Sequence, residues 1–333
     1  MPSHRLFVSG FAIISVLSVA LPAVADELTP QQIYERAAPA VVLVIGHSEQ
    51  GGNGSGGTGS LIRRDGLVLT SAHVIIEEKT GRPYPRLSVF LKPDRVTGNP
   101  KTDLAQRVRA SVVAFDRMLD LALLKMEDAP PAIPVLELGD PDRVKIGERV
   151  VAIGHPEQGG LWTLTTGVIS AEFEDYNNTK GKHVFQTETG LNRGNSGGPL
   201  LDSQGRIIGV NTAIARLAPD GLPITSISFA LKSSVARTWL QSQAVPVDYA
   251  SGPLERPERL PVPTQAPIQA APPEPASSAP KVSPPKATAP PLPQVHTEVR
   301  PYDMDMLIRS TSKEEQELDQ MMREMRQKAP PRR

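Results

Sequence analysis

Short apolar runs separated by turn residues dominate the chain between about residues 40 and 230. Runs such as VVLVIG (41–46), DLALLKM (120–126) and RIIGVNTAI (206–214) are cut by Gly, Pro, Asp and Asn. They recur roughly every 10–20 residues with no long 3.6-residue period between them, which indicates antiparallel strands in a sandwich or barrels. We therefore predict an all-β fold, with a hairpin turn at Asp65-Gly66.

Helices are predicted on either side of this β-rich region. Thr29 is suited to be an N-cap, with Pro30 at the first helical position and Gln32 placed to complete a capping box. Residues 231–243 fit a closing helix.

The first residues have the pattern of a secretory leader. An apolar run ends at Ala23-Val24-Ala25, an A-x-A cleavage pattern, and Asp26 begins polar sequence. We predict a signal peptide over 1–25, with a membrane anchor as the alternative because the run is nearly long enough to span a bilayer. The mature protein is then exported, to a bacterial periplasm or out of the cell.

The composition changes abruptly after Ala244. Residues 245–301 hold about half of the 34 prolines and keep no apolar periodicity, which predicts a disordered linker. Residues 302–333 follow as a Met-rich helical tail, with a capping box at Ser312 and Glu315 and an apolar stripe of Leu318, Met321, Met322 and Met325. This tail is either a weak, solvated helix or a motif that docks onto a protein partner, the chain's own barrel or the cell envelope.

Charge and cysteine content narrow the possible functions. The chain has 36 basic and 36 acidic residues, and this zero net charge argues against general binding of nucleic acid or membrane surfaces. The lack of cysteine excludes disulfides, thiolate metal sites and a Cys nucleophile. We expect no metal or organic cofactor.

The stretch GNSGGPL (194–200) raises the question of a serine nucleophile. It fits a tight turn, and it also fits G-x-S-x-G, the nucleophile elbow of α/β-hydrolases. An elbow needs its acid and histidine after the serine, but only His296, in the proline-rich segment, follows Ser196. We therefore reject the elbow.

A histidine and an aspartate precede the serine in another known order. His73 follows an apolar run and Asp120 begins one, which gives the order His, Asp, Ser of chymotrypsin-type enzymes. A serine hydroxyl needs a base, histidine is the natural base, and aspartate fixes its tautomer. Asp120 is preferred to the rival Asp116 because the apolar run starts directly after it. The amides of Gly194 and Ser196 are candidates for an oxyanion hole.

The sequence around these residues resembles the HtrA-type (Deg-type) serine proteases, the trypsin-like heat-shock proteases of bacterial envelopes and organelles. GTGSLIRRDGLVLTSAHVI (57–75), LGDPDRVKIGERVVAIGHP (138–156) and TETGLNRGNSGGPLLDSQGRIIGVNTAI (187–214) carry the resemblance, which covers about residues 30–243. It implies two six-stranded antiparallel barrels of the chymotrypsin type within a protease domain at 26–244. It also implies that His73, Asp120 and Ser196 form the triad.

Some features depart from this family. Its members usually carry PDZ domains after the protease, so we expect PDZ-based regulation to be absent here. His155-Pro156-Glu157-Gln158 stands where many relatives have Asn-Pro-Phe-Gly, and Ser226–Leu231 replaces their glycine-rich strand. Relatives often form trimers through N-terminal aromatic residues, of which this chain has only Tyr34, so the oligomeric state is left open. We interpret His47, His155 and His183 as ordinary surface or core histidines.

Specificity follows from the residue six positions before the serine, which forms the floor of the primary pocket in trypsin-like folds. That residue is Gly190, so no carboxylate stands there to pair with Lys or Arg, and we predict cleavage after small or medium aliphatic residues. The alternative is that Glu188 turns inward and restores a basic preference. The backbone of Asn211, Thr212 and Ala213 is expected to line the pocket and pair with substrate as an added strand.

Together these features predict an exported serine endopeptidase that acts on unfolded or damaged proteins through an acyl-enzyme. The alternative from another class is a chaperone-like or partner-binding module on the same fold, with little or gated proteolytic activity.

Overall fold

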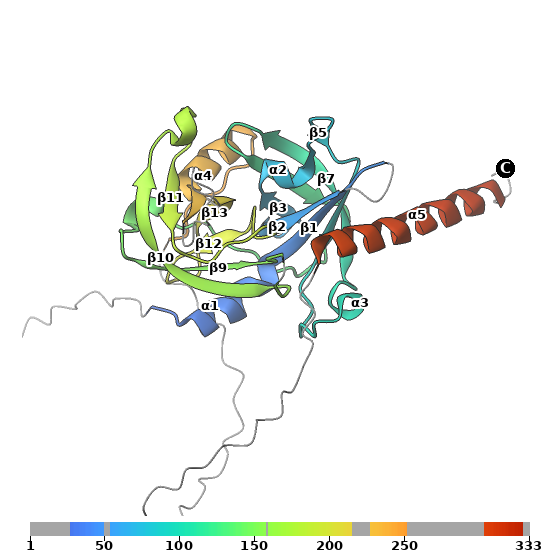
Figure 1. The fold of residues 1–333 in the computed structure, drawn as a ribbon, viewed down its shortest axis with the longest axis horizontal. Coiled ribbons are helices and arrows are strands. Elements are labelled where there is room, and N and C mark those ends of the chain that lie inside the picture. The colour runs from blue at the N-terminus through green and yellow to red at the C-terminus, as the bar shows by residue number, and fades with distance from the viewer. Residues whose placement is uncertain (1–26, 50–53, 158, 215–226, 252–302, 329–333) are drawn as a thin grey trace, which may run out of the picture.

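The computed structural model describes residues 27–49, 54–157, 159–214, 227–251 and 303–328 (Figure 1). The expected signal peptide (1–25) lies outside these residues. So does the expected linker (245–301), apart from 245–251, where the Ala250 amide donates to the Leu138 carbonyl. In the described ranges, no helix combines the length and apolar character needed to cross a membrane.

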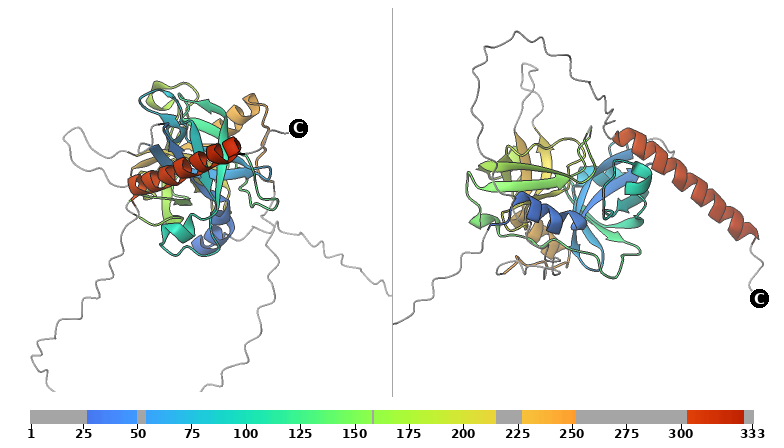
Figure 2. Two further views of the ribbon diagram at one scale, coloured as in Figure 1. Left: turned by 90° about the vertical axis from the view of Figure 1, so that its right-hand side faces the viewer. Right: turned by 90° about the horizontal axis from the view of Figure 1, so that it is seen from below.

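Two closed six-stranded antiparallel barrels lie side by side, which confirms the predicted all-β fold (Figures 1 and 2). The N-terminal barrel has the order β1-β2-β3-β8-β7-β6, and its strands are β1 (Val41–His47), β2 (Gly54–Arg63), β3 (Leu67–Thr70), β6 (Arg86–Phe90), β7 (Arg107–Asp116) and β8 (Leu121–Met126). The C-terminal barrel has the order β10-β11-β14-β13-β12-β9, and its strands are β9 (Arg149–Gly154), β10 (Thr163–Phe173), β11 (Val184–Thr187), β12 (Pro199–Leu201), β13 (Ile207–Ile214) and β14 (Ser228–Lys232). A small sheet of β4 (Ile76–Glu77) and β5 (Arg82–Pro83) follows the third strand.

The apolar runs become strands because their side chains fill the barrels. All seven residues of β1 are buried, since this strand also contacts β9 of the other barrel and a helix on the outside. The predicted turn at Asp65-Gly66 joins β2 to β3, and Gly66 has φ +88°, a conformation that glycine adopts without strain.

Short helices close the barrels. They are α1 (Pro30–Ala37), α2 (Ala72–Ile75), α3 (Pro100–Asp103) and α4 (Ser233–Ser242), with single 3-10 turns at η1 (Ala38–Ala40), η2 (Pro141–Arg143) and η3 (Tyr176–Asn178). The predicted capping box of α1 is present: the Gln32 amide donates to Thr29 Oγ1 at 3.3 Å, and the Thr29 amide donates to Gln32 Oε1 at 2.9 Å. The predicted closing helix is α4.

The tail helix α5 (Met304–Lys328) lies against the N-terminal barrel at its start and then extends beyond it (Figures 1 and 2). Met304, Leu307 and Ile308 are buried there. Glycines of β2 make room for them, since a Cβ at Gly56 would overlap Met304 Sδ and one at Gly54 would lie 2.6 Å from Ile308 Cγ2. The interpretation of the tail as a solvated helix is therefore wrong for its first turns.

The start of this helix also differs from the prediction. Ser312, the expected cap, lies inside α5 and is buried. Asp303 takes that place, because its Oδ1 accepts from the Met306 amide at 3.1 Å. Met321 of the predicted stripe is 54% exposed, so contact with the barrel uses earlier residues than expected.

Candidate active site

The expected triad residues stand at strand ends where the two barrels meet. β3 and β8 pair in antiparallel register, so the end of one meets the start of the other. His73 lies in α2 just after β3 and Asp120 just before β8, so this pairing brings them together. Ser196 belongs to the loop before β12 of the other barrel, and its carbonyl accepts a 2.8 Å hydrogen bond from the Thr58 amide of β2.

The Asp120 carboxylate contacts His73 at both its imidazole and its backbone amide. His73 Nδ1 lies 2.8 Å from Asp120 Oδ2 and 3.0 Å from Oδ1, and the His73 amide donates to Oδ1 at 3.0 Å. Burial raises the pKa of Asp120, but hydrogen bonds and charge from His73, together with the Thr212 hydroxyl, outweigh burial and leave the pKa below its ordinary value. An ionised carboxylate only accepts, so Nδ1 carries the proton and Nε2 is left as the base.

Asp116, the rival carboxylate, has a different place. Its Oδ1 accepts from the amides of Met118 at 2.8 Å and Leu119 at 2.9 Å, which closes the turn before Asp120. Asp120 then has φ +63°, in the left-handed region that aspartate tolerates better than most residues. Of the two, Asp120 is the carboxylate that contacts His73.

Thr212 contributes a contact that sequence reasoning missed. Its hydroxyl donates to Asp120 Oδ2, across the junction between the barrels. From the sequence, the backbone of Thr212 is expected to line the substrate pocket and to pair with substrate. A threonine in a strand of alternating apolar and small residues gives no signal of a partner that lies in the other barrel.

The serine loop leaves two amides open. Among the described residues, neither the Gly194 nor the Ser196 amide finds a hydrogen-bond acceptor. Gly194 has φ +97°, and a Cβ there would overlap the His155 carbonyl oxygen, so glycine is required. The Arg193 carbonyl accepts from the Glu157 amide at 2.6 Å. Because the peptide is trans, this bond points the Gly194 N–H away from the 155–157 segment, as an oxyanion donor requires.

A buried network behind this loop was not predicted. The Thr58 hydroxyl donates to the Gly194 carbonyl at 2.7 Å. Since it has one proton, its oxygen accepts from the His155 amide at 3.2 Å and from His155 Nδ1 at 3.0 Å. His155 is fully buried, with the Trp162 ring edge-on at 4.8 Å, and burial lowers its pKa to about 3. It is thus a neutral core histidine, and it supports the oxyanion loop through Thr58.

The expected pocket residues lie around the same loop. Within the part of the chain that the structure describes, no atom beyond the neighbouring residues lies within 4 Å of the Cβ position of Gly190, and Glu188 is exposed. The Asn211 amide donates to the Gly198 carbonyl at 2.9 Å, and its carbonyl accepts from the Gly197 amide at 2.7 Å. Asn211 therefore holds the serine loop with its own backbone, and pairing of 211–213 with a substrate stays a prediction.

No metal site accompanies these residues. Across the described ranges, no three His, Asp or Glu side chains gather in a way that could hold a metal ion.

Comparisons with known proteins show that part of the chain is similar to serine proteases. Residues 57–210 match the family described as trypsin-like peptidase domain. The chain is 34% identical over 200 residues to the magnetosome formation protease MamE of Paramagnetospirillum magneticum, which covers 59% of this chain and 25% of that protein. It is 35% identical over 187 residues to the periplasmic pH-dependent serine endoprotease DegQ of Escherichia coli, covering 56% of this chain and 36% of that one.

Solved structures agree with these relatives. The HtrA-type protease AlgW with a tripeptide matches with a TM-score of 0.53 and 29% identity, over 65% of this chain and 64% of that one. The chain thus spans about a quarter to a third of the length of the curated relatives, and α5 lies outside the segment that matches the peptidase family.

Proposed function

The chain carries an HtrA-type, trypsin-like serine protease domain, and from this premise we propose that it is an exported serine endopeptidase acting on unfolded or damaged polypeptides. The observation that carries the proposal is the His73–Asp120 pair at the barrel junction, beside a serine loop with two open amides. Periplasmic relatives such as DegQ support export.

The geometry supports a two-step hydrolysis. Ser196 Oγ attacks the substrate carbonyl while His73 Nε2 takes its proton, and the amides of Gly194 and Ser196 hold the developing oxyanion. His73 then gives the proton to the leaving amine, and an acyl-enzyme on Ser196 remains. Water attacks this ester with His73 again as the base, which releases the acid and restores the serine. Asp120 keeps Nδ1 protonated throughout and stabilises the imidazolium.

Specificity follows from the pocket floor. Among the described residues, no carboxylate faces the open space at Gly190, which supports cleavage after small or medium aliphatic residues, because a Lys or Arg side chain would be desolvated there without a partner. Glu188 is exposed, which gives no support to the alternative in which it forms an acidic pocket floor.

Labelling with a fluorophosphonate serine probe tests the proposal. The mature protein, starting at Asp26, is expected to be labelled at neutral pH and to digest casein, and Ser196→Ala is expected to lose both activities. A Ser→Ala change at half-buried Ser234 on α4 serves as the matched control and is expected to keep both. Labelling that persists in Ser196→Ala would show that another residue is the nucleophile.

The same experiment separates the alternative function. A wild-type protein that suppresses aggregation of unfolded casein without labelling or cleavage would be a binding module on a protease fold. N-terminal sequencing of the protein from a periplasmic fraction tests export, and a first residue other than Asp26 would contradict the proposed cleavage site.

A further inference from the structure

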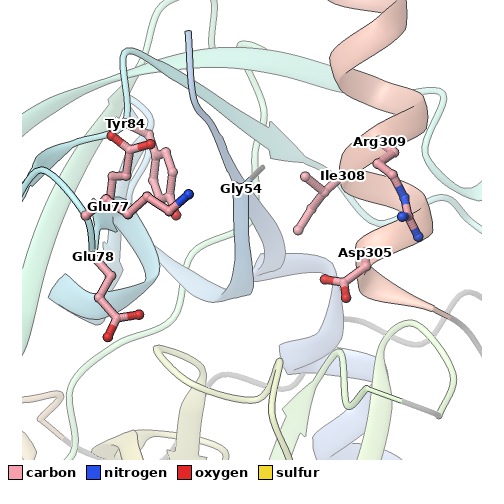
Figure 3. A pocket seen from close by; sticks show the side chains of 8 residues that line it. Gly54, Glu77, Glu78, Tyr84, Asp305, Ile308 and Arg309 are labelled. Atoms are coloured by element: carbon pink, nitrogen blue, oxygen red, sulfur yellow. The ribbon is translucent and has the colours of Figure 1, made fainter. Parts of the chain in front are cut away.

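A pocket of about 320 Å³ lies between the tail helix α5 and the segment after β4 (Figure 3). Glu77 and Tyr84 line it on one side, Asp305 and Ile308 on the other, and Gly54 of β2 forms part of the wall between them. The helix is therefore one wall of a hollow that the barrel alone would not form.

Two elements connect this pocket with the catalytic residues. β2 runs from Gly54 in the pocket to Thr58, whose amide donates to the Ser196 carbonyl at 2.8 Å. At a rise of about 3.3 Å per residue, these positions are about 13 Å apart. On the other wall, Glu77 ends β4, which directly follows the short helix that carries His73. The pocket thus lies within reach of a peptide bound at Ser196.

The position of the pocket indicates which side of the scissile bond it would bind. The acyl part of the substrate is expected on the C-terminal barrel, at Gly190 and 211–213. The leaving amine receives its proton from His73 on the N-terminal barrel, where the pocket also lies. An extended chain advances about 3.3 Å per residue, so the pocket suits the second to fourth residue after the cleaved bond.

The charge of the pocket indicates which kind of substrate side chain would bind there. Three carboxylates, of Glu77, Glu78 and Asp305, line it with two cations, Lys79 and Arg309, which leaves an excess of one negative charge. Burial raises the pKa of the nearby Tyr84 hydroxyl, the Glu77 and Glu78 charges raise it further, and the Arg193 charge opposes them in part.

The shape of the pocket agrees with its charge. Figure 3 shows Ile308 and Asp305 on the side of α5 that faces Tyr84, whereas the Arg309 guanidinium lies on the far side of the helix. Ile308 is only 2% exposed, so the apolar surface open to a side chain in this pocket is that of the half-buried Tyr84 ring opposite Asp305. Long cationic side chains combine an apolar stem with a charged head, which matches this arrangement.

We propose that this pocket binds a Lys or Arg side chain of the substrate, two to four residues after the scissile bond, so that the tail helix α5 forms part of the substrate-binding surface. This inference rests on the proposed endopeptidase function. It assigns to α5 a direct role in choosing substrates.

Paired quenched peptides test the assignment in the full-length mature protein. Each pair shares the residues before the cleaved bond and carries either Lys or its uncharged analogue norleucine at the second, third or fourth position after it. At one of these positions the wild type is expected to prefer Lys by about threefold in kcat/KM, the size of a partly exposed charge contact. Asp305→Asn is expected to bring the ratio near one, and Asp305→Lys to invert it.

The control is Glu317→Gln on the part of α5 that extends beyond the barrel, where Glu317 is exposed and pairs with Lys313 at 3.9 Å. It is expected to keep the preference for Lys. Fluorophosphonate labelling, which reports Ser196 alone, is expected to proceed at the same rate in all these variants. A wild type without preference, or a preference unchanged in Asp305→Lys, would overturn the pocket assignment while labelling persists. Loss of labelling in the wild type would instead overturn the proposed function.

Discussion

His73 follows β3 of the N-terminal barrel and His155 follows β9 of the C-terminal barrel, and the two side chains differ in exposure and in hydrogen-bond partner. The His73 side chain is 48% exposed and contacts the Asp120 carboxylate through its Nδ1. His155 is fully buried, contacts the neutral Thr58 hydroxyl, and has its pKa lowered to about 3 by burial. The first side chain is open to solvent beside a carboxylate, whereas the second stays neutral and holds a backbone in place.

This difference separates two requirements of the proposed reaction. Proton transfer depends on side-chain charge, which a carboxylate beside the imidazole supplies. Stabilisation of the oxyanion depends on the direction of two backbone amides, those of Gly194 and Ser196. The carbonyls that share their peptides, of Arg193 and Asn195, accept hydrogen bonds from the Glu157 and Gly198 amides, which fix that direction. Substitutions in the two regions should therefore fail in different ways.

The largest effect is expected from Asp120→Asn. An amide in this place favours the wrong imidazole tautomer, and the loss in a triad of this geometry is about 10⁴-fold in kcat. Casein or peptide hydrolysis at neutral pH measures it. Asp116→Asn is the matched control, because the amide oxygen can still accept from Met118 and Leu119 and close the turn. Equal losses in the two variants would show that Asp120 acts through the fold of this turn instead of through His73.

Acid is expected to destabilise the protein because His155 is neutral in the folded state. His155 takes up a proton near pH 6.5 when unfolded but only near pH 3 when folded, so the unfolded state binds the extra proton between these values. The free energy of unfolding therefore falls as pH falls from about 6.5 toward 3, by about 1.4 kcal/mol per pH unit for this group.

Urea unfolding of the wild type and of His155→Asn at pH 6.5 and 4.5 checks this. The variant is expected to lose less stability over that interval by about 2–3 kcal/mol, because it lacks the group that titrates. His47, also buried and with a pKa lowered to about 4, is unchanged in both proteins and cancels in the difference. An identical loss in the two proteins would mean that His155 is protonated equally in both states.

A smaller effect is expected from Thr58→Val. The change keeps the shape but removes the hydrogen bond to the Gly194 carbonyl, and we expect about a tenfold fall in kcat and in the rate of fluorophosphonate labelling. Thr166→Val, on an exposed position of β10, provides the control for a strand threonine. If labelling by the variant is as fast as in the wild type, the buried network does not set the oxyanion loop.

The smallest effect is expected from Glu157→Gln. This change removes the ion pair with Arg193, at 3.6 Å between Nη1 and Oε1, but leaves the backbone bond between the same two residues. Arg193 is 61% exposed, and an exposed pair contributes little, so we expect kcat to change by less than about twofold. A large loss would show that the side chain, and not the amide, positions the loop.

The sequence predicted those features that arise from regular patterns. Short apolar runs separated by turn residues led to antiparallel strands in a sandwich or barrels, and the family resemblance supplied the two six-stranded barrels. The place of Asp120 at the head of an apolar run led to its choice over Asp116, and the pairing of β3 with β8 explains why it meets His73. The Thr58–His155 contact was not predicted. It joins residues 97 positions apart in the chain, and a threonine or a histidine beside an apolar run does not show which residue it will contact.

The position of α5 was hidden for a different reason. Its docking surface consists partly of Gly54 and Gly56, and a run of glycines has the composition of a loop. The apolar stripe that the sequence suggested begins after the residues that make the contact, which are Met304, Leu307 and Ile308.

The docked helix α5 and the barrel belong to one chain, so a cut between them changes how tightly the helix is held. Residues 252–302 join the helix to the barrel covalently, so the contact between the two does not weaken when the protein is diluted. A single cut in the connection turns the contact into a bimolecular equilibrium, and dilution then releases the helix. If α5 is a wall of the substrate pocket, a protease that cuts its own chain between the barrel and α5 changes its own substrate preference. Cut and uncut molecules would then differ in the peptides that they cleave.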